Sequence, residues 1–276
     1  MNMLATPVLP AEAVPAAPAT GTAGALLRVE NLSREFGGVL AIENLSFTVT
    51  RGDIHSIIGP NGAGKTTLFN LITGVYKPSG GTVLFDGATV SGLPPYRLAA
   101  RGMSRTFQNL QIFFNMTAIE NVMVGRHLHL DGRLLPALFR FPSLARKDRE
   151  AKERAAELMA SVGLGRYVDA HASAMPYGAL KRLEIARALA SEPKLLLLDE
   201  PAAGLNATES REIDAVIKAV ADSGVTVILV EHDMKMVMGI SDRITALNYG
   251  RKLAEGTPAE VAANPDVVAA YLGTMD

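Results

Sequence analysis

The sequence predicts an α/β fold with a mostly parallel sheet, an antiparallel β edge and an inserted helical lobe. Apolar segments of strand length alternate with helical segments along most of the chain, an order typical of parallel sheets covered by helices. Two strand-like segments, Leu26–Asn31 and Val39–Val49, flank a Phe36-Gly37-Gly38 turn near the start. A charged stretch with a helical pattern, Arg126–Val162, interrupts the alternation and predicts the inserted lobe.

Glycine-containing turns divide the first half of the chain. Gly74 lies just past a helical pattern and is a stop signal, and Asp86-Gly87 is a turn signal that closes a strand. The elements expected here are the strands Asp53–Ile58, Thr82–Phe85 and Met103–Gln108 and the helices Lys65–Thr73 and Tyr96–Gly102.

The second half contains the most apolar segments. Apolar residues at helical spacing predict a helix over Gly178–Ser191, which Pro193 ends. Lys194–Asp199 and Val225–Val230 have the composition of fully buried strands. The remaining expected elements are the helices Ala207–Ala221, Thr257–Ala262 and Val267–Leu272 and the strands Arg243–Asn248 and Lys252–Ala254.

Composition excludes several classes of function. The chain has 276 residues, with 27 Lys and Arg against 28 Asp and Glu, so bulk electrostatics do not favour nucleic-acid binding. The absence of cysteine excludes disulfides, thiolate catalysis and cysteine-based zinc sites. The apolar runs are shorter than the ~20 residues of a membrane span. Residues 1–25, rich in Ala and Pro, are expected to form a disordered tail before a domain over 26–276, whose lobe spans about 109–190.

A glycine-rich segment lies between the expected strand Asp53–Ile58 and the expected helix Lys65–Thr73. It reads Gly59-Pro60-Asn61-Gly62-Ala63-Gly64-Lys65-Thr66-Thr67 and matches the phosphate-binding pattern G-x-x-x-x-G-K-[ST]. Glycines let the backbone wrap around phosphate, and the helix start adds its positive dipole end. Lys65 is expected to contact the β- and γ-phosphates, and the Thr66 hydroxyl to ligate Mg²⁺. The alternative is a chance glycine turn before a helix.

Two adjacent carboxylates, Asp199 and Glu200, end the apolar strand. Ligand sites in such sheets lie beyond the carboxyl ends of the strands. Asp199 is expected to hold Mg²⁺ through a water, and Glu200 to polarise an attacking water. Alone, this pair would also fit a helix cap or a surface pair. Together with Gly59–Thr67 it predicts a nucleoside triphosphate hydrolase, and the chain lacks the Asn-Lys-x-Asp guanine reader of Ras-type GTPases.

Four further motifs follow in order along the chain. They are Arg105–Asn109, which contains Gln108, Met175–Leu189, Ala203–Asn206, and Glu231-His232-Asp233. In this order and spacing, the motifs resemble the ATP-binding subunits of ABC transporters from about Leu27 to the carboxyl end. The resemblance implies the ABC ATPase fold on a P-loop NTPase core, with ATP and Mg²⁺ as ligands.

Several stretches are similar to the branched-chain (hydrophobic) amino-acid importers within that family. They are Arg105–Leu110, the lobe Arg126–Val162, Tyr177-Gly178, Pro201–Asn206 and the ending Asn264–Gly273. The implied function is to energise an importer of branched-chain or other hydrophobic amino acids. Related urea or amide importers, lipopolysaccharide exporters, a soluble ABC ATPase acting on DNA or ribosomes, and a binding module with negligible ATPase activity are the alternatives.

The resemblance implies a role for each motif residue. Phe36 would stack on adenine, although it also fits a hydrophobic residue of a strand turn. Thr67 would lie near the α-phosphate. Gln108 would reach Mg²⁺ or the attacking water and sense the membrane partner; its alternative is a solvated polar residue. Glu200 would be the general base, and His232 would hydrogen-bond the γ-phosphate and align the water.

The signature segment departs from the family pattern Leu-Ser-Gly-Gly-Gln. It reads Met175-Pro176-Tyr177-Gly178-Ala179, so Pro176 supplies neither a hydroxyl nor an amide hydrogen. ABC subunits work as head-to-tail dimers, and Tyr177 and Gly178 would lie over the nucleotide of the other subunit. The departure fits either tolerated drift or a weak clamp. A heterodimer with an ATPase that carries the better signature is the favoured hypothesis, and a homodimer is the alternative.

The resemblance also implies partners and a place in the cell. Integral-membrane permease subunits, a second ABC ATPase subunit and, indirectly, a solute-binding protein are expected, and no nucleic acid. The chain would be peripheral, at the cytoplasmic face of the plasma (inner) membrane. Leu110–Met116, with Phe113 and Phe114, is the expected docking segment for the permease. The basic residues between Arg140 and Arg154 fit a solvated helix face or a permease contact, and His127 and His129 lack further ligands for a metal site.

Overall fold

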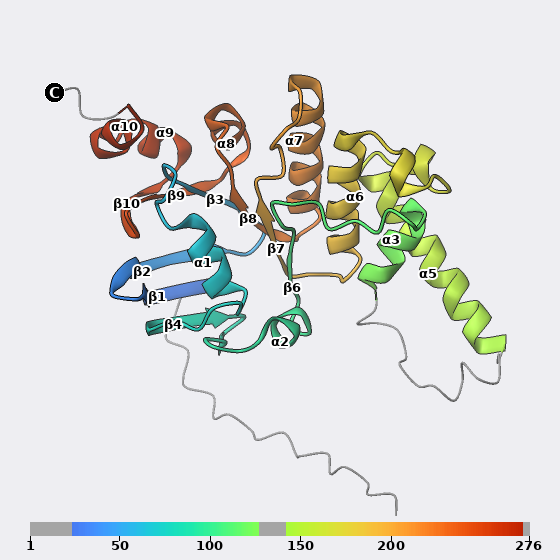
Figure 1. Cartoon of the computed structure of the whole chain (residues 1–276), viewed down its shortest axis with the longest axis horizontal. Coiled ribbons are helices and arrows are strands. Elements are labelled where there is room, and N and C mark those ends of the chain that lie inside the picture. Colours follow the sequence, from blue (N-terminus) through green and yellow to red (C-terminus); the bar gives the residue numbers. More distant parts are fainter. Residues whose placement is uncertain (1–23, 127–141, 273–276) are drawn as a thin grey trace, which may run out of the picture.

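The computed structural model describes residues 24–126 and 142–272, apart from the side chains of residues 142–148 and 272. Its strands form two sheets with helices packed around them (Figure 1). The expected α/β fold, with a mostly parallel sheet and an antiparallel edge, is confirmed. Most of the expected tail, together with His127, His129 and Arg140, lies outside the described residues. The limits proposed for the domain and its lobe stay predictions.

The first sheet is antiparallel and has the strand order β2-β1-β4-β5. Its strands are β1 (Ala25–Phe36), β2 (Val39–Thr50), β4 (Gly80–Phe85) and β5 (Ala88–Thr89). The expected turn at Phe36-Gly37-Gly38 joins β1 to β2, with Phe36 paired opposite Val39. This hairpin therefore places Phe36 and Val39 at the tip of the sheet.

The second sheet has the order β10-β9-β3-β8-β7-β6 and is parallel except for β10, which runs antiparallel to β9. Its strands are β3 (Ile54–Ile58), β6 (Met103–Arg105), β7 (Leu195–Asp199), β8 (Thr226–Val230), β9 (Arg243–Asn248) and β10 (Arg251–Gly256). The strand expected over Met103–Gln108 ends at Arg105. The Thr106 amide still donates to the Leu197 carbonyl at 2.9 Å, and the chain then leaves this edge of the sheet.

The two faces of the parallel sheet belong to different cores, because successive side chains of a strand point to opposite faces. Leu195 and Leu197 pack with α1 (Lys65–Ile72) and with the antiparallel sheet, so α1 lies between the two sheets (Figure 1). Leu196 and Leu198 pack on the opposite face. The helices that cover that face are α6 (Tyr177–Leu189), α7 (Ala207–Asp222) and α8 (Met234–Ile240).

The carboxyl-terminal helices α9 (Pro258–Ala262) and α10 (Pro265–Leu272) cover the β9 side of the sheet. Val261 and Val267 form a third small core there with Ile58, Val237 and Ile244. The short helix α2 (Pro95–Ala99) precedes β6. The end of β3, from which the glycine-rich loop starts, is therefore buried.

Helices α3 (Ala118–Gly125) and α5 (Pro142–Ser161) pack together with α6 beside the parallel sheet, as Figure 1 shows. Short 3₁₀ turns at η2 (Gly165–Tyr167) and η3 (Ala172–Ala174) connect α5 to α6. The sequence analysis missed α3, which begins at a reciprocal cap between Thr117 and Glu120. In the part of the chain that the structure describes, no helix has the length and hydropathy needed to cross a membrane.

Candidate functional site

The glycine-rich loop joins β3 to α1 and is packed tightly on both sides. Gly59 has φ 155°, and a Cβ there would lie 2.4 Å from the Leu247 carbonyl oxygen. Gly64 has φ 101°, and a Cβ there would lie 2.7 Å from the Ala41 carbonyl oxygen. Because side chains would collide at both positions, the shape of the loop requires glycine.

The amino terminus of α1 presents unpaired donors to this loop. Gly64 precedes the helix and has no side chain to cap it. The first N–H groups of any helix lack intrahelical acceptors and carry the positive end of its dipole. The loop and the helix start together therefore form an anion site of the phosphate-binding kind.

Lys65 supplies a buried ammonium group to the same loop. Its Nζ donates to the carbonyl oxygens of Gly59 at 2.7 Å and Pro60 at 3.1 Å. Burial lowers the pKa of Lys65, whereas the charges of Glu200 and Asp199 raise it. The ammonium group is thus held at the loop, with acidic groups near enough to influence its proton affinity.

One pocket collects most of the expected site residues. It is lined by Val39, Leu40, Ala41, Asn61, Gly62, Ala63, Gly64, Lys65, Thr66, Thr67, Gln108, Glu200, His232 and Tyr249. The loop, the residue after β7 and two polar side chains from distant motifs therefore meet at the carboxyl end of the parallel strands. This edge is where the sequence analysis placed the ligand.

Glu200 is the centre of a three-residue contact in that pocket. Gln108 Nε2 donates to Glu200 Oε2 at 2.9 Å, and His232 Nε2 lies 2.7 Å from Glu200 Oε1. Glu200 has φ 51°, and its backbone N–H donates to the Val230 carbonyl at 2.9 Å. An anionic carboxylate only accepts hydrogen bonds, so the imidazole proton lies on Nε2 when Glu200 is ionised. The carboxylate is placed to accept a proton from a water that enters the pocket.

Asp199 does not line the pocket, because Arg105 covers it. Arg105 Nη2 donates to Asp199 Oδ2 at 2.8 Å, and the two side chains are only 8% and 6% exposed. Arg105 Nη1 also donates to Asn70 Oδ1 at 2.7 Å. In the sequence, Arg105 drew notice only as the first residue of the motif that contains Gln108. The available signal was a cation at the end of the strand that pairs with the strand of Asp199.

The oxygen atoms of this region have the chemistry that magnesium prefers. The Thr66 hydroxyl is exposed in the pocket, Gln108 keeps its amide oxygen free of the bond to Glu200, and Asp199 keeps Oδ1 free of Arg105. Hydroxyl, amide and carboxylate oxygens are the ligands that Mg²⁺ takes. No group of three His, Cys, Asp or Glu residues within the described ranges could hold a metal. Thr66, Gln108 and Asp199 therefore suit an ion that takes further ligands from the phosphate oxygens of its substrate.

Phe36 does not line the pocket in this conformation. Its ring meets the Tyr76 ring edge-on at a centroid distance of 5.2 Å, and the Arg34 guanidinium lies 4.4 Å from its centroid. The aromatic residue among the lining residues is Tyr249, on the turn between β9 and β10. That turn is bound to the loop, since the Gly250 N–H donates to the Ala63 carbonyl at 3.0 Å. The adenine role of Phe36 stays a prediction.

The signature residues lie apart from the pocket. α6 begins at Tyr177, and Pro176 before it provides no side-chain cap. The Tyr177 ring packs beside the next motif, because a Cβ on Gly204 would lie 3.3 Å from it. A Cβ on Gly178 would lie 2.7 Å from Glu209 Oε1. Contact of Tyr177 and Gly178 with a nucleotide thus stays a prediction that requires a second subunit.

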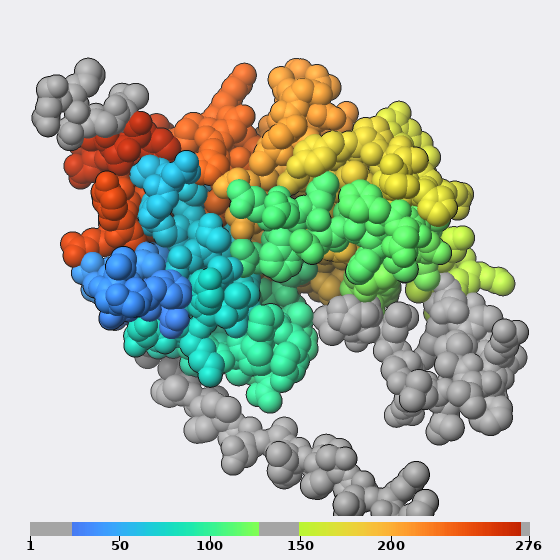
Figure 2. Space-filling model, in the orientation of Figure 1, coloured from blue at the N-terminus to red at the C-terminus, as the bar shows by residue number. Residues whose placement is uncertain are grey.

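The segment between β6 and α3 presents exposed aromatic side chains. Phe113 and Phe114 are 46% and 49% exposed, and the Phe113 N–H donates to Asn121 Oδ1 at 2.9 Å. The segment crosses the front of the molecule between α1 and α6 (Figure 2). Lys181 Nζ on α6 donates to the Gln108 carbonyl at 3.4 Å. Gln108, which contacts Glu200, thus belongs to the same segment as Phe113 and Phe114.

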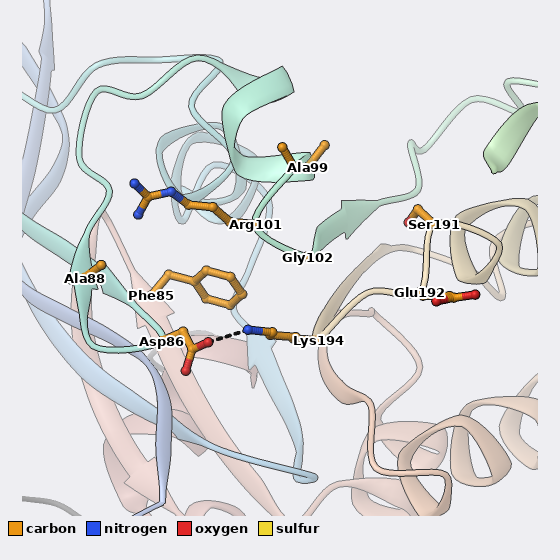
Figure 3. Close-up of a pocket in the computed structure, with 10 residues that line it drawn as sticks. Phe85, Asp86, Ala88, Ala99, Arg101, Gly102, Ser191, Glu192 and Lys194 are labelled. Atoms are coloured by element: carbon orange, nitrogen blue, oxygen red, sulfur yellow. Dashed lines mark hydrogen bonds and ion pairs between the residues drawn. The ribbon is translucent and has the colours of Figure 1, made fainter. Parts of the chain in front are cut away.

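A second hollow lies at the opposite end of the parallel strands (Figure 3). Phe85, Asp86, Arg101 and Lys194 are among its lining residues, and Lys194 Nζ donates to Asp86 at 2.5 Å. Arg51 also pairs with Asp86. This hollow shares no residue with the phosphate pocket.

Comparison with known proteins agrees with the motifs. A family model for ABC transporters matches residues 42–203, and a model for branched-chain amino acid ATP-binding cassette transporters matches residues 251–276. The high-affinity branched-chain amino acid transport ATP-binding protein BraF of Pseudomonas aeruginosa is 47% identical over 249 residues, which cover 90% of this chain and 98% of that protein. LivG of Escherichia coli, which bears the same description, has the same identity and coverage.

Solved structures show the same similarity. The crystal structure of a nucleotide-free ATP-binding cassette from an ABC transporter superposes with a TM-score of 0.79 at 32% identity. The match covers 90% of this chain and 99% of that one. The similarity thus covers nearly the whole chain, including the loop, the pocket and the two sheets.

Proposed function

Since this chain belongs to the ABC transporter family, among the branched-chain amino acid transport ATP-binding proteins, we propose that it binds and hydrolyses ATP to energise amino-acid import. The observation that carries the proposal is the contact of Glu200 with both Gln108 and His232 beside the phosphate loop. A phosphate loop alone would support binding. A carboxylate aligned by two polar side chains at the same pocket supports hydrolysis as well.

Binding rests on the loop and on the start of α1. The backbone N–H groups of the loop donate to the phosphate oxygens, and the helix dipole favours their negative charge. Lys65 turns its ammonium group from the carbonyl oxygens of Gly59 and Pro60 to the β- and γ-phosphates. Thr66, Gln108 and Asp199 would hold Mg²⁺, which neutralises charge on the phosphates when it is bound.

Hydrolysis rests on Glu200. A water held between the pocket wall and the γ-phosphate gives its proton to the carboxylate as its oxygen attacks phosphorus. The bond between the γ-phosphorus and the bridging oxygen breaks, which leaves ADP and inorganic phosphate. His232 keeps the carboxylate oriented through Oε1, and Gln108 fixes Oε2.

The partners follow from the same premise. The chain would sit at the cytoplasmic face of the plasma membrane, bound to permease subunits that form the path for the solute. Phe113 and Phe114 offer the exposed aromatic surface for that contact. The backbone from Phe113 back to Gln108 would then connect the permease surface with the hydrolysis site, since Gln108 contacts Glu200.

The second ATPase subunit is proposed to be a different chain. The site formed by the loop, Glu200 and His232 is complete in its residue types, whereas Pro176 leaves the start of α6 without a hydroxyl or a side-chain cap. A charge-assisted hydrogen bond is worth roughly 1.5–3 kcal/mol, so a partner with a better signature would clamp this chain's ATP more firmly. A full hydrolysis rate from this chain alone as a homodimer would contradict the heterodimer.

Co-purification with the permease followed by reconstitution tests the function. Vesicles that contain the complex should take up leucine or valine only when ATP is supplied on the side of the membrane to which this chain is bound. Phosphate release should rise with uptake. Urea and a short amide serve as competing solutes. If urea or the amide were taken up and leucine and valine were not, the chain would belong with the urea or amide importers. Phosphate release that no solute or permease changes would favour a soluble ATPase.

A further inference from the structure

We propose that Glu231 is a positioning residue that fixes His232 relative to Glu200, an inference that rests on the proposed hydrolysis function. Glu231 Oε1 accepts the Ala202 N–H at 2.8 Å, and Oε2 accepts the His232 N–H at 3.0 Å. One carboxylate therefore holds the backbone of two segments. The first follows Glu200 by two residues, and the second carries the imidazole.

These contacts close a ring of covalent and hydrogen bonds. The chain runs from Glu200 through Pro201 to Ala202, crosses to Glu231, continues to His232 and returns to Glu200 through the 2.7 Å side-chain contact. The Glu200 N–H also donates to the Val230 carbonyl at 2.9 Å, which ties the same two segments once more. In such a ring, the position of the imidazole depends on the Glu231 carboxylate as well as on Glu200.

The chemistry of Glu231 argues against an incidental contact. The residue is 4% exposed, and a buried carboxylate is costly unless hydrogen bonds compensate it. Burial raises the pKa of Glu231, the backbone amides of Ala202, His232 and Asp233 lower it, and the nearby charge of Glu200 raises it. The molecule thus keeps a second carboxylate beside Glu200 in an unfavourable environment. Its compensating bonds go to the two segments that carry the site.

The ring also reaches the signature surface. Ala202 lies two residues before Gly204, whose neighbour is the Tyr177 ring at the start of α6. A movement of the Pro201–Gly204 segment would therefore pull on Glu231 and, through it, on His232. In this way a contact of the second subunit at Tyr177 would change the alignment of the imidazole.

The variant Glu231→Gln tests the proposal with little change in size. Its amide keeps one acceptor oxygen and puts an NH₂ group in place of the other, so at least one bond from a backbone N–H is lost. We expect kcat for ATP to fall by about tenfold or more, because a charge-assisted bond is lost from the ring. KM should stay within about twofold, since the contacts of Lys65 and the loop are unchanged.

The measurement uses the full-length chain co-purified with its membrane partners. Glu260→Gln is the matched control, because Glu260 also accepts a backbone N–H, from Thr257 at 2.7 Å, but lies on α9 away from the pocket. The control should keep the wild-type kcat. Wild-type phosphate release tests the proposed function, and the ratio of variant to wild type tests Glu231, so the two can fail separately.

A second measurement needs no turnover. The chain has five histidines, and the imidazole resonances of His232 can be assigned by their loss in His232→Gln. Glu231→Gln should shift the His232 resonances and leave those of the buried His55 in place, which shows that the fold is kept. Glu231→Gln should also lower kcat by a smaller factor in a His232→Ala background. An unmoved His232 signal, or an equal loss of kcat in both backgrounds, would overturn the proposal.

Discussion

Arg105 and Asp199 form a buried ion pair, with 2.8 Å between guanidinium nitrogen and carboxylate oxygen and side-chain exposures of 8% and 6%. The Arg105 guanidinium also lies 5.4 Å from the Phe69 ring centroid and 5.2 Å from that of Phe107. The carboxylate expected to serve the metal thus has an internal counter-ion. Asp199 is thereby fixed at the end of β7 by residues of α1 and β6.

Arg105→Met should destabilise the fold, because it leaves Asp199 as a buried charge without a partner. Breaking such a pair costs roughly 3–5 kcal/mol, measured as the free energy of unfolding in urea. The pair Arg251 and Glu43 is the control, since its side chains are 67% and 35% exposed. Arg251→Met should cost at most about 1 kcal/mol. Adding Asp199→Asn to Arg105→Met should recover part of the loss, and no recovery would contradict the pairing argument.

Lys65→Ala should abolish ATP binding. The substitution removes the only side-chain cation among the loop residues 59–67 and leaves the Gly59 and Pro60 carbonyls without their donor. Calorimetry with ATP should show no detectable heat of binding for the variant. Lys218→Ala, on α7 away from the lining residues of the pocket, should bind like the wild type. Nucleotide affinity retained by Lys65→Ala would count against the loop.

Glu200→Gln should separate binding from hydrolysis. The amide keeps the size of the side chain but accepts no proton from water, so phosphate release should fall by about 10²–10⁴-fold. The affinity for ATP should stay close to that of the wild type, because Lys65 and the helix start are unchanged. Glu255→Gln, on β10, is a control that should keep full turnover. Unchanged turnover in Glu200→Gln would remove Glu200 as the base.

His55 should make the stability of the fold depend on pH. The side chain is buried on β3 with Nε2 bonded to Thr245 Oγ1 at 2.8 Å, and burial, followed by the charges of Arg243 and Lys252, lowers its pKa from 6.5 to about 3. As the pH falls below about 6.5, His55 is protonated in the unfolded chain, whereas in the folded chain it stays neutral until about pH 3. The free energy of unfolding therefore falls as the pH falls through this window, by about 2 kcal/mol at about pH 5.

Urea unfolding at about pH 8 and about pH 5 measures this contribution. In His55→Leu the loss between the two pH values should be about 2 kcal/mol smaller than in the wild type. The leucine leaves the Thr245 hydroxyl without its partner, which lowers stability at both pH values and so cancels in the comparison. His171→Gln, at an exposed position, should keep the wild-type loss. An equal loss in His55→Leu would show that the proton uptake lies elsewhere.

Much of the fold could be predicted from local signals. Apolar strands such as Leu195–Asp199, the glycines around Lys65 and the turn at Gly37 each have a short-range cause in the sequence. Helices α3 and α8 were missed because they are short and begin at capping residues, Thr117 and Asp233, whose signal is weaker than a long apolar period. Gln108 follows β6 as expected, although that strand already ends at Arg105.

The site could be predicted in part, and the missing part depends on long-range contacts. Glu200, His232 and Gln108 were expected near the loop because each follows a strand or a motif, and the structure gathers them in one pocket. The bonds of Arg105 to Asp199 and of Glu231 to Ala202 join distant segments. Contacts of this kind cannot be predicted from hydrophobic periodicity or from motif spacing. Phe36 was expected in the site but lies outside the pocket. Its packing on Tyr76 and Arg34 could not be predicted from the turn that contains it.

The place of β3 between β8 and β9 has a consequence for biosynthesis. The strand that leads into the loop is made early, but both of its neighbours come from the last quarter of the chain, and the Gly250 N–H that holds Ala63 comes later still. Residues up to Gly250 must therefore leave the ribosome before β3 can pair on both sides and the phosphate loop can take its folded shape. We expect nascent chains that end before β8 to bind no ATP, because the loop then lacks the strands that hold it in place.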